Sequence, residues 1–264
     1  MHKTLWCPLS TIKSFVIVYE CSAEEESMCR DYVALDIETT GLRPEQDEII
    51  EIGAVRYKEG VPVEIYSSLI KPNAVVSSRI TEITGITNEM LKNERSCREV
   101  LWEFLAFVGD EDIIGHNIRF DYSFLKAHAY KQKKGFDNKA IDTLYLAKKL
   151  HPELESRALS AMCLHYGIIN EHAHRAYDDA KACAELYEKM YNQFGETNTE
   201  LFRAKVINYK VKKEESITNR QKFYLNDLMK YHKINLETPI DSLTKSDASR
   251  LIDKIILNYG RISF

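Results

Sequence analysis

Residues 32–41, with the sequence YVALDIETTG, constrain the fold most strongly because their side chains alternate in character. Apolar residues at every second position predict a β-strand with one buried face. Asp36 and Glu38 then share the opposite face, and the Thr-Thr-Gly that follows predicts a turn. Neighbouring carboxylates repel each other, and such hard oxygen ligands suit a divalent metal ion. An exposed edge strand with an acidic outer face is the alternative interpretation.

The order of the remaining elements indicates an α/β fold. Two further strands at 48–57 and 63–70, joined by a turn at Glu59 and Gly60, predict an antiparallel meander with the first strand. Beyond them, short apolar segments alternate with amphipathic helices, which predicts a mixed sheet flanked by helices. The expected later strands are 113–114 and 140–142, and the expected helices are 77–84, 96–108, 118–132, 143–150, 157–166 and 176–194.

Charge and composition divide the 264 residues into four expected parts. Residues 1–29 form an N-terminal extension, within which 13–20 predict a short strand, and residues 30–195 form the main domain. Residues 196–216 are expected to be a polar linker, and residues 217–264 a helical tail. From Gly195 onward the chain has 13 Lys and Arg against 9 Asp and Glu, whereas 23 basic and 31 acidic residues precede it. A mildly basic tail therefore follows an acidic domain.

Composition also narrows the class of protein. The net charge of −4 is mild and does not by itself indicate a nucleic-acid partner. The six cysteines are scattered without a CxxC pair, which argues against a zinc site or a disulfide scaffold and favours a reducing compartment. No apolar run approaches the roughly 20 residues of a membrane span, so we expect a cytoplasmic protein without a membrane partner.

Two aspartates lie on the apolar faces of expected helices. In the helix from Ala176, Asp179 shares the apolar face with residues three and four positions away, whereas Asp178 projects with the polar residues. Asp121 lines up in the same way with apolar neighbours in the helix from residue 118. A buried carboxylate costs several kcal/mol unless it is paired, neutralised or bound to metal. For either residue alone, a favourable position at a helix start is the competing explanation.

Three further residues stand at positions where a general base or a metal ligand could lie. His174 lies just ahead of the helix from Ala176 and is a candidate general base, with His172 as a competitor that spacing alone does not exclude. Asp142 stands where a strand meets a helix, and a helix N-cap is favoured there over a metal ligand.

Three segments together resemble a known family. Residues 36–41 (DIETTG), 115–121 (GHNIRFD) and 174–180 (HRAYDDA) resemble the three exonuclease motifs of the DEDDh 3′–5′ exonucleases. The resemblance is closest to the proofreading epsilon subunits of bacterial DNA polymerase III. It extends over about residues 30–195, and the segments 84–87 and 142–144 also resemble family features.

The resemblance implies an RNase H-like α/β fold with a five-stranded mixed sheet flanked by helices, to which this chain adds a small C-terminal helical region. It implies a catalytic site with two Mg²⁺ or Mn²⁺ ions and His174 as the general base. The implied metal ligands are Asp36, Glu38, Asp121 and Asp179. The implied contacts to the 3′-terminal nucleotide are Thr39, Thr40, Leu42, Asn117 and Phe120.

The activity implied is release of nucleoside 5′-monophosphates from the 3′ end of DNA, preferably single-stranded, with RNA as a variant and a polymerase as a possible partner. A non-catalytic binding module with the same fold is the competing hypothesis. An inactive relative is expected to lack at least one of the five implied catalytic residues. All five are present here, so we expect an active exonuclease in proofreading or repair.

The tail has several interpretations. Capping boxes at Thr218 with Gln221 and at Thr244 with Asp247 predict two helices. A hairpin whose aromatic residues form its own small core is the favoured interpretation. A nucleic-acid grip or a partner-binding role is the alternative, since lysines bind phosphates and aromatic rings stack on bases. The residues available for a grip are Lys212, Lys213, Arg220, Lys222, Phe223, Tyr224 and Tyr231.

Overall fold

The computed structural model describes residues 30–212, 215–236 and 239–262. The expected N-terminal extension, including its short strand at 13–20, and Lys213 lie outside the described residues. Within the described residues, no helix is both long enough and apolar enough to span a lipid bilayer.

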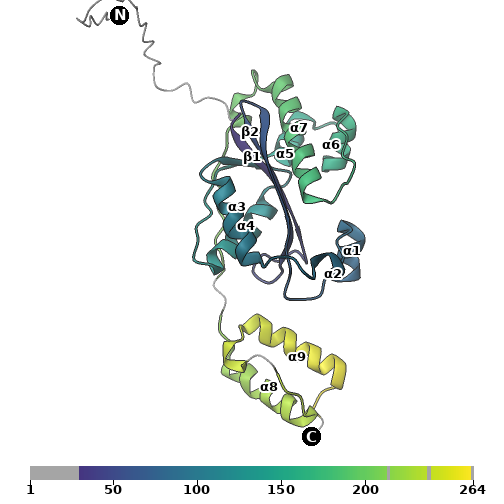
Figure 1. Cartoon of the computed structure of the whole chain (residues 1–264), viewed down its shortest axis with the longest axis vertical. Coiled ribbons are helices and arrows are strands. Elements are labelled where there is room, and N and C mark those ends of the chain that lie inside the picture. Colours follow the sequence, from purple (N-terminus) through teal and green to yellow (C-terminus); the bar gives the residue numbers. More distant parts are fainter. Residues whose placement is uncertain (1–29, 213–214, 237–238, 263–264) are drawn as a thin grey trace, which may run out of the picture.

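A five-stranded mixed sheet forms the centre of the main domain, as predicted (Figure 1). Its order is β3-β2-β1-β4-β5, so the first predicted strand lies in the middle. β1, β2 and β3 form the predicted antiparallel meander, and β4 and β5 run parallel to β1. The strands are β1 Tyr32–Thr39, β2 Ile49–Lys58, β3 Val61–Leu69, β4 Asp112–Gly115 and β5 Ala140–Asp142.

Helices cover both faces of the sheet, so alternate residues of β1 are buried on opposite sides. Leu35 and Ile37 pack with α3 and α4, whereas Ala34 packs in the second core with α5, α6 and α7. The helices are α1 Ser78–Thr84, α2 Asn88–Leu91, α3 Cys97–Val108, α4 Arg119–Lys131, α5 Thr143–Leu150, α6 Leu159–Tyr166 and α7 Ala176–Phe194. The short α2 and the 3₁₀ turns at Thr199–Phe202 and Ile240–Ser242 were not predicted.

Side-chain caps explain several helix ends. Ser96 and Glu99 form a capping box at the start of α3, and Gly85 ends α1 with a left-handed backbone. The Asp142 carboxylate accepts hydrogen bonds from the first backbone N–H groups of α5. The preference for Asp142 as an N-cap is therefore confirmed.

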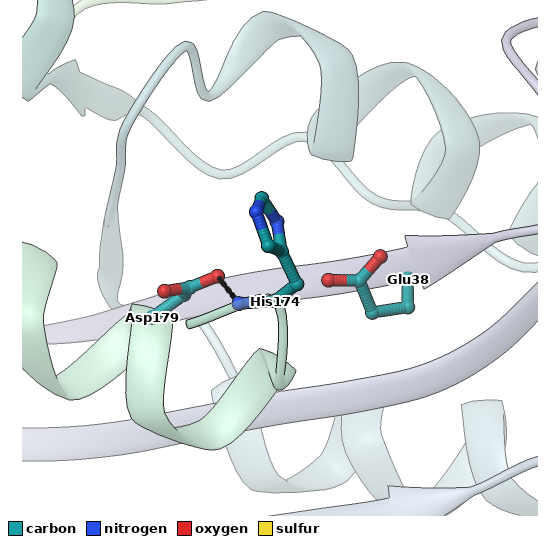
Figure 2. A group of neighbouring side chains, drawn as sticks. All are labelled: Glu38, His174 and Asp179. Atoms are coloured by element: carbon teal, nitrogen blue, oxygen red, sulfur yellow. Dashed lines mark hydrogen bonds between the residues drawn. The ribbon is translucent and has the colours of Figure 1, made fainter. Parts of the chain in front are cut away.

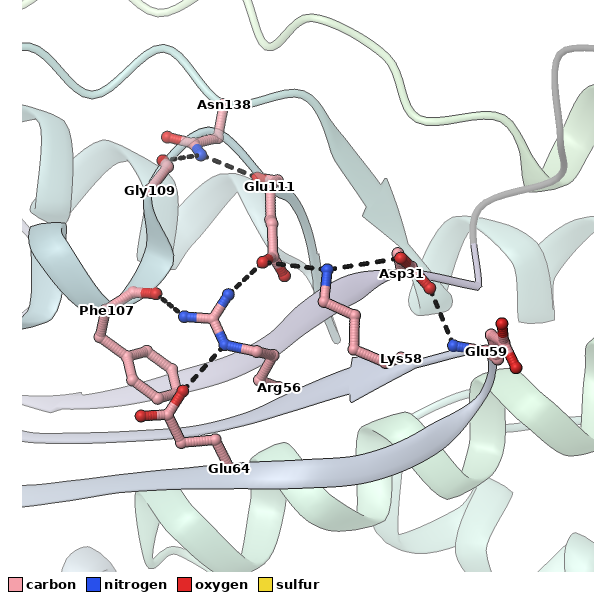
Figure 3. Close-up of polar contacts among 9 residues, drawn as sticks. All are labelled: Asp31, Arg56, Lys58, Glu59, Glu64, Phe107, Gly109, Glu111 and Asn138. Carbon is pink, nitrogen blue, oxygen red and sulfur yellow. Dashed lines mark hydrogen bonds and ion pairs between the residues drawn. The ribbon is translucent and has the colours of Figure 1, made fainter. Parts of the chain in front are cut away.

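A polar network ties the strands together around the start of β1 and the end of β2 (Figure 3). Arg56 of β2 bonds to Glu64 of β3, to Glu111 before β4 and to the carbonyl of Phe107. Lys58 adds ion pairs to Glu111 and to Asp31, which precedes β1. Asp36 and Glu38 lie towards the other end of β1, so this network is separate from them.

The segment 196–216, expected to be a linker, packs against the main domain over its first part. Phe202 is fully buried in the core on the α7 side of the sheet. Lys205 and Ala140 exchange backbone hydrogen bonds of 2.8 and 2.9 Å, so the segment runs beside the edge strand β5. Tyr209 then packs against the core on the other face.

The tail contains the two predicted helices, α8 Asn219–His232 and α9 Lys245–Tyr259, with both predicted capping boxes. The two helices pack on each other (Figure 1). The expectation of an aromatic core is wrong, because this core is aliphatic and Phe223 is 72% exposed. Leu225 and Leu228 face inward at helical spacing, and Phe223 projects from another face of α8. The core residues are Ile217, Leu225, Leu228, Ala248, Ile252 and Ile255.

Candidate active site

Asp36 and Glu38 occupy the centre of the site because β1 is the middle strand of the sheet. Both are half-buried, and between them Ile37 is buried towards the opposite face. β1 pairs with β4 only as far as Ala34, so the β1 backbone next to the carboxylates is open on that side.

Asp121 enters the site through this opening between β1 and β4. It is only 3% exposed, and its Oδ1 accepts a 3.1 Å hydrogen bond from the backbone N–H of Ile37. The carboxylate thus satisfies a backbone donor that β4 does not reach. α4 begins four residues after β4 ends, which places its first turn, with Asp121, beside the end of β1.

α7 carries Asp179 onto the face of the sheet that holds Asp36 and Glu38. Gly53 of β2 lies directly opposite Asp36 in the strand register and makes this approach possible. A Cβ atom at Gly53 would lie 2.1 Å from the backbone nitrogen of Tyr177 and 2.2 Å from the carbonyl carbon of Ala176. The absence of a side chain therefore lets the first turn of α7 lie against the sheet next to the carboxylates.

Glu51 fixes the same helix end to the sheet. It lies opposite Glu38 in the register and is 1% exposed. Its carboxylate accepts hydrogen bonds from Arg175 at 2.7 and 3.2 Å and from the backbone N–H of Ala176 at 3.0 Å. A buried carboxylate is stabilised when charge-assisted bonds of this kind pair it. The result is a rigid connection between β2 and the start of α7.

Glu38, His174 and Asp179 form a group whose potential ligand atoms all lie within 4.8 Å of one another. Figure 2 shows the imidazole of His174 between the two carboxylates. Asp179 Oδ2 accepts the backbone N–H of His174 at 2.9 Å, which holds His174 in a left-handed conformation with φ of 67°. The other oxygen of Asp179 accepts a 2.6 Å bond from the amide of Asn170.

The neighbours of this group point elsewhere. Asp178 lies 3.6 Å from His172, and His172 is exposed. The structure therefore brings Asp179 and His174, rather than Asp178 and His172, to the carboxylates of β1.

Burial raises the pKa values of the converging carboxyl groups, and repulsion within the group adds to the shift at Asp36 and Glu38. The pKa of Asp36 is well above its ordinary value, first through burial and then through Asp121, Glu38 and Asp179. Burial and the same neighbourhood raise the pKa of Glu38 to about 8. Burial also raises the pKa of Asp121 to about 8, although the N–H of Ile37 opposes this shift. The pKa of Asp179 is raised by burial, against the amide of Asn170.

This donor set fits a divalent cation. Asp121 of α4 and Asp179 of α7 lie close enough to Asp36 and Glu38 of β1 to raise the pKa of both, and a cation between the four groups would remove that repulsion. Carboxylate oxygens are the ligands that Mg²⁺ and Mn²⁺ prefer, and the Glu38–His174–Asp179 group of the described residues holds one imidazole and no thiolate, which is not a zinc-type set.

The expected nucleotide contacts fall into two groups. Leu42, Asn117 and Phe120 line one cleft of about 410 Å³, and Leu42 is 81% exposed at its edge. The hydroxyl of Thr39 donates to the carbonyl of Gly41 at 2.6 Å, and that of Thr40 accepts the N–H of Glu48 at 2.9 Å. The two threonines thus shape the turn after β1 and are not among the residues that line the cleft.

Sequence reasoning missed four residues that build the site, namely Glu51, Gly53, Asn170 and Arg175. A detectable signal existed for Glu51, because a carboxylate inside the apolar run EIIEIGAV requires a partner when the strand is buried. The signal for Gly53 was a glycine inside a strand, which often marks close backbone approach. Asn170 and Arg175 show no comparable pattern.

The comparisons with known sequences agree with this geometry. The RNase_T exonuclease family model matches residues 33–187. The chain is 38% identical over 189 residues to DNA polymerase III PolC-type of Clostridium perfringens, covering 72% of this chain and 13% of that relative. It is 37% identical over 164 residues to DNA polymerase III subunit epsilon of Aquifex aeolicus, covering 61% of this chain and 81% of that subunit.

Solved structures show the same fold. Exonuclease X in complex with 5′ overhanging duplex DNA matches with a TM-score of 0.54 and 25% identity, covering 65% of this chain and 99% of that one. Exonuclease I of E. coli in complex with a dT13 oligonucleotide matches with a TM-score of 0.58 and 21% identity, covering 65% and 43%. With an exonuclease family model that matches more than half of its residues, the chain belongs to the RNase_T exonuclease family.

Proposed function

We propose that the chain is a metal-dependent 3′–5′ exonuclease that removes nucleoside 5′-monophosphates from the 3′ end of DNA, with a preference for single strands. The observation that carries this proposal is the convergence of Asp36, Glu38, Asp121 and Asp179 beside one histidine. Asp121 and Asp179 each accept one backbone hydrogen bond, but these bonds do not remove the repulsion that the four acidic groups from three separate elements bring to Asp36 and Glu38. Membership of an exonuclease family supports the same reaction class.

Two Mg²⁺ or Mn²⁺ ions are the proposed cofactors. Asp36, Glu38 and Asp179 would hold them, with Asp121 contributing to the second ion. When bound, such ions polarise the phosphodiester, make water more acidic and stabilise the leaving oxygen.

The remaining catalytic roles are proposed to belong to residues of the chain itself. His174 is exposed beside Glu38 and Asp179, which supports the proposal that its imidazole takes a proton from the attacking water. The water oxygen bonds to the phosphorus of the terminal phosphodiester as the bond from that phosphorus to the 3′ oxygen breaks. The 3′ oxygen stays on the shortened strand and takes up a proton to become a hydroxyl, and the nucleoside 5′-monophosphate is released. The Glu51–Arg175 ion pair fixes the start of α7, and with it His174 and Asp179, at one position beside β1. Leu42, Asn117 and Phe120 are proposed to hold the terminal nucleotide.

A polymerase is the proposed partner. The relatives named above are DNA polymerase III components, and the epsilon subunit matches this chain over most of its own length. We therefore place the proposed activity in proofreading or repair.

End-labelled oligonucleotides test the proposal. A single-stranded DNA labelled at its 3′ end should release labelled mononucleotide at once in Mg²⁺, and the same strand labelled at its 5′ end should shorten as a ladder. EDTA should abolish both results, and duplex DNA and RNA of the same sequence define the preference. Release from the 5′ end, internal cuts or full activity in EDTA would contradict the proposal.

A further inference from the structure

A second cleft continues from the one that Leu42, Asn117 and Phe120 line. It has a volume of about 550 Å³, and the two clefts share Glu45 and Lys212 in their walls. The two clefts therefore adjoin, and together they are called the groove; its first part holds the proposed nucleotide contacts. The residues that line the second cleft are Glu45, Tyr130, Lys131, Lys133, Lys134, Val211 and Lys212.

Four of these seven residues are lysines, which sets the second cleft apart within an otherwise acidic domain. Lys133, Lys134 and Lys212 are exposed. The ammonium group of Lys134 lies over the ring of Trp102, 4.4 Å from its centroid, in a cation–π contact. Among the described residues that line the cleft, Glu45 is the one carboxylate; it accepts a 2.7 Å bond from the hydroxyl of Tyr209 and interacts with the charge of Lys212.

Aromatic side chains accompany the charges along the groove. Tyr130 is 50% exposed in the second cleft, and Phe120 and Tyr209 line the first. Lysines that track a backbone, together with rings on which bases stack, are the features of a single-strand binding path.

The segment after the family-matched range builds one wall of this groove and is fastened in place. Arg119 contacts the carbonyl of Asn208 at 3.4 Å, and Tyr209 is bonded to Glu45. Lys131 donates to the carbonyl of Glu45 at 2.7 Å, which holds the loop after β1 against α4. The groove is therefore formed by the packing of residues 208–212 on the main domain.

We propose that this groove binds the phosphodiester backbone of the nucleotides that precede the 3′-terminal one. Lys133 and Lys212 contact phosphates from opposite walls, and Tyr130 and Tyr209 stack on bases. The direction of the strand rests on the proposed function, whereas binding in the groove does not. Backbone contacts do not read the 2′-OH, so DNA and RNA strands bind alike here.

The test compares two double variants of the full chain that each remove two positive charges. Lys133→Gln/Lys212→Gln alters the groove, whereas Lys189→Gln/Lys254→Gln alters exposed lysines of α7 and α9. Glutamine is uncharged and only one atom shorter than lysine, and all four positions are exposed, so the substitutions should change packing little. Fluorescence anisotropy in EDTA gives the Kd of labelled dT20, rU20 and a dinucleotide for each protein. A separate assay in Mg²⁺ measures hydrolysis of the dinucleotide by the unsubstituted chain and so tests the proposed function.

The groove variant should bind dT20 and rU20 at least about tenfold more weakly at about 50 mM salt. Its slope of log Kd against log salt should fall by about 1.4, because each lost contact to a phosphate of a single strand lowers the slope by about 0.7. The control variant should bind both strands as the unsubstituted chain does. An equal loss of affinity in both variants, or no loss in either, would overturn the proposal that the groove binds the strand. If dT20 binding depends on the groove lysines but the dinucleotide is not hydrolysed, the groove stands and the proposed function fails.

Discussion

The guanidinium of Arg175 donates hydrogen bonds of 2.7 and 3.2 Å to the carboxylate of Glu51, which is buried opposite Glu38 on β2. This pair joins the strand beside the proposed metal ligands to the helix that carries Asp179. The two residues are 124 positions apart in the sequence.

Arg175→Ala should weaken both stability and activity. It leaves the buried Glu51 carboxylate with only the N–H of Ala176, at a cost of about 1–3 kcal/mol in the free energy of unfolding. The first turn of α7 then loses its anchor, and kcat should fall about 10- to 100-fold, since small misplacements of catalytic groups are costly. Urea unfolding and release of mononucleotide measure the two effects. Arg203→Ala, which removes an exposed ion pair with Glu200, is the control and should cost less than about 1 kcal/mol.

Gly53→Ala should disturb the site through packing alone. The added methyl group would overlap the backbone of Ala176 and Tyr177, so α7 must move away from the sheet. Overpacking of this kind costs about 1–3 kcal/mol, and mononucleotide release should fall with it. In Gly135→Ala the nearest atom lies at 3.6 Å, so thermal denaturation and activity should stay unchanged. Equal behaviour of the two variants would show that α7 does not need its close approach to β2.

His174→Ala separates a general base from a metal ligand. Loss of a general base lowers kcat by about 10²- to 10⁴-fold. The proposed base role predicts that Mn²⁺ affinity, measured by calorimetry, changes little, because the four carboxylates remain. A large loss of Mn²⁺ affinity would instead assign the imidazole to the metal, which its position within 4.8 Å of Glu38 and Asp179 also permits.

Without metal, stability should fall as the pH rises from about 5 to about 8. The ordinary pKa of Glu38 is 4.5 and that of Asp121 is 3.8, and both are raised to about 8 in the folded protein. Between these values the folded state holds protons that the unfolded chain has released, so raising the pH favours unfolding. Melting temperatures in EDTA should therefore decrease across this range, and Mg²⁺ should raise them most near pH 8.

Glu38→Gln is the matched control for this pH dependence, because it removes one titrating group and leaves the histidines in place. Its melting temperature in EDTA should decline less steeply than that of the unsubstituted protein. A melting temperature that rises from about pH 5 to about pH 8 in EDTA would contradict the raised pKa values.

Periodicity predicted the long helices because each packs one face against the sheet, and it separated Asp179 from Asp178 for the same reason. It also predicted β1, although the expectation of a single buried face was wrong, because helices cover both faces of this central strand. Asp179 lies on the stripe that α7 packs against the sheet, and a carboxylate there required an explanation. The capping boxes of α8 and α9 likewise predicted where both helices begin.

Periodicity and capping patterns could not predict contacts between residues that are far apart in the sequence. The Glu51–Arg175 pair, the opening between β1 and β4 that admits Asp121 and the packing of Tyr209 on Glu45 all depend on how separate elements meet. The aromatic core expected for the tail failed for a related reason. Composition identified Phe223 as a large apolar residue, but the helix phase set by Leu225 and Leu228 turned it outward.

Mononucleotide release by Asp179→Ala tests the central claim most directly. The acidic groups of β1, α4 and α7 are proposed to form one site for divalent cations, so losing one of them should abolish Mg²⁺-dependent release from a 3′-labelled single strand. Circular dichroism and the melting temperature should show a folded protein. Release at the rate of the unsubstituted chain would contradict the account.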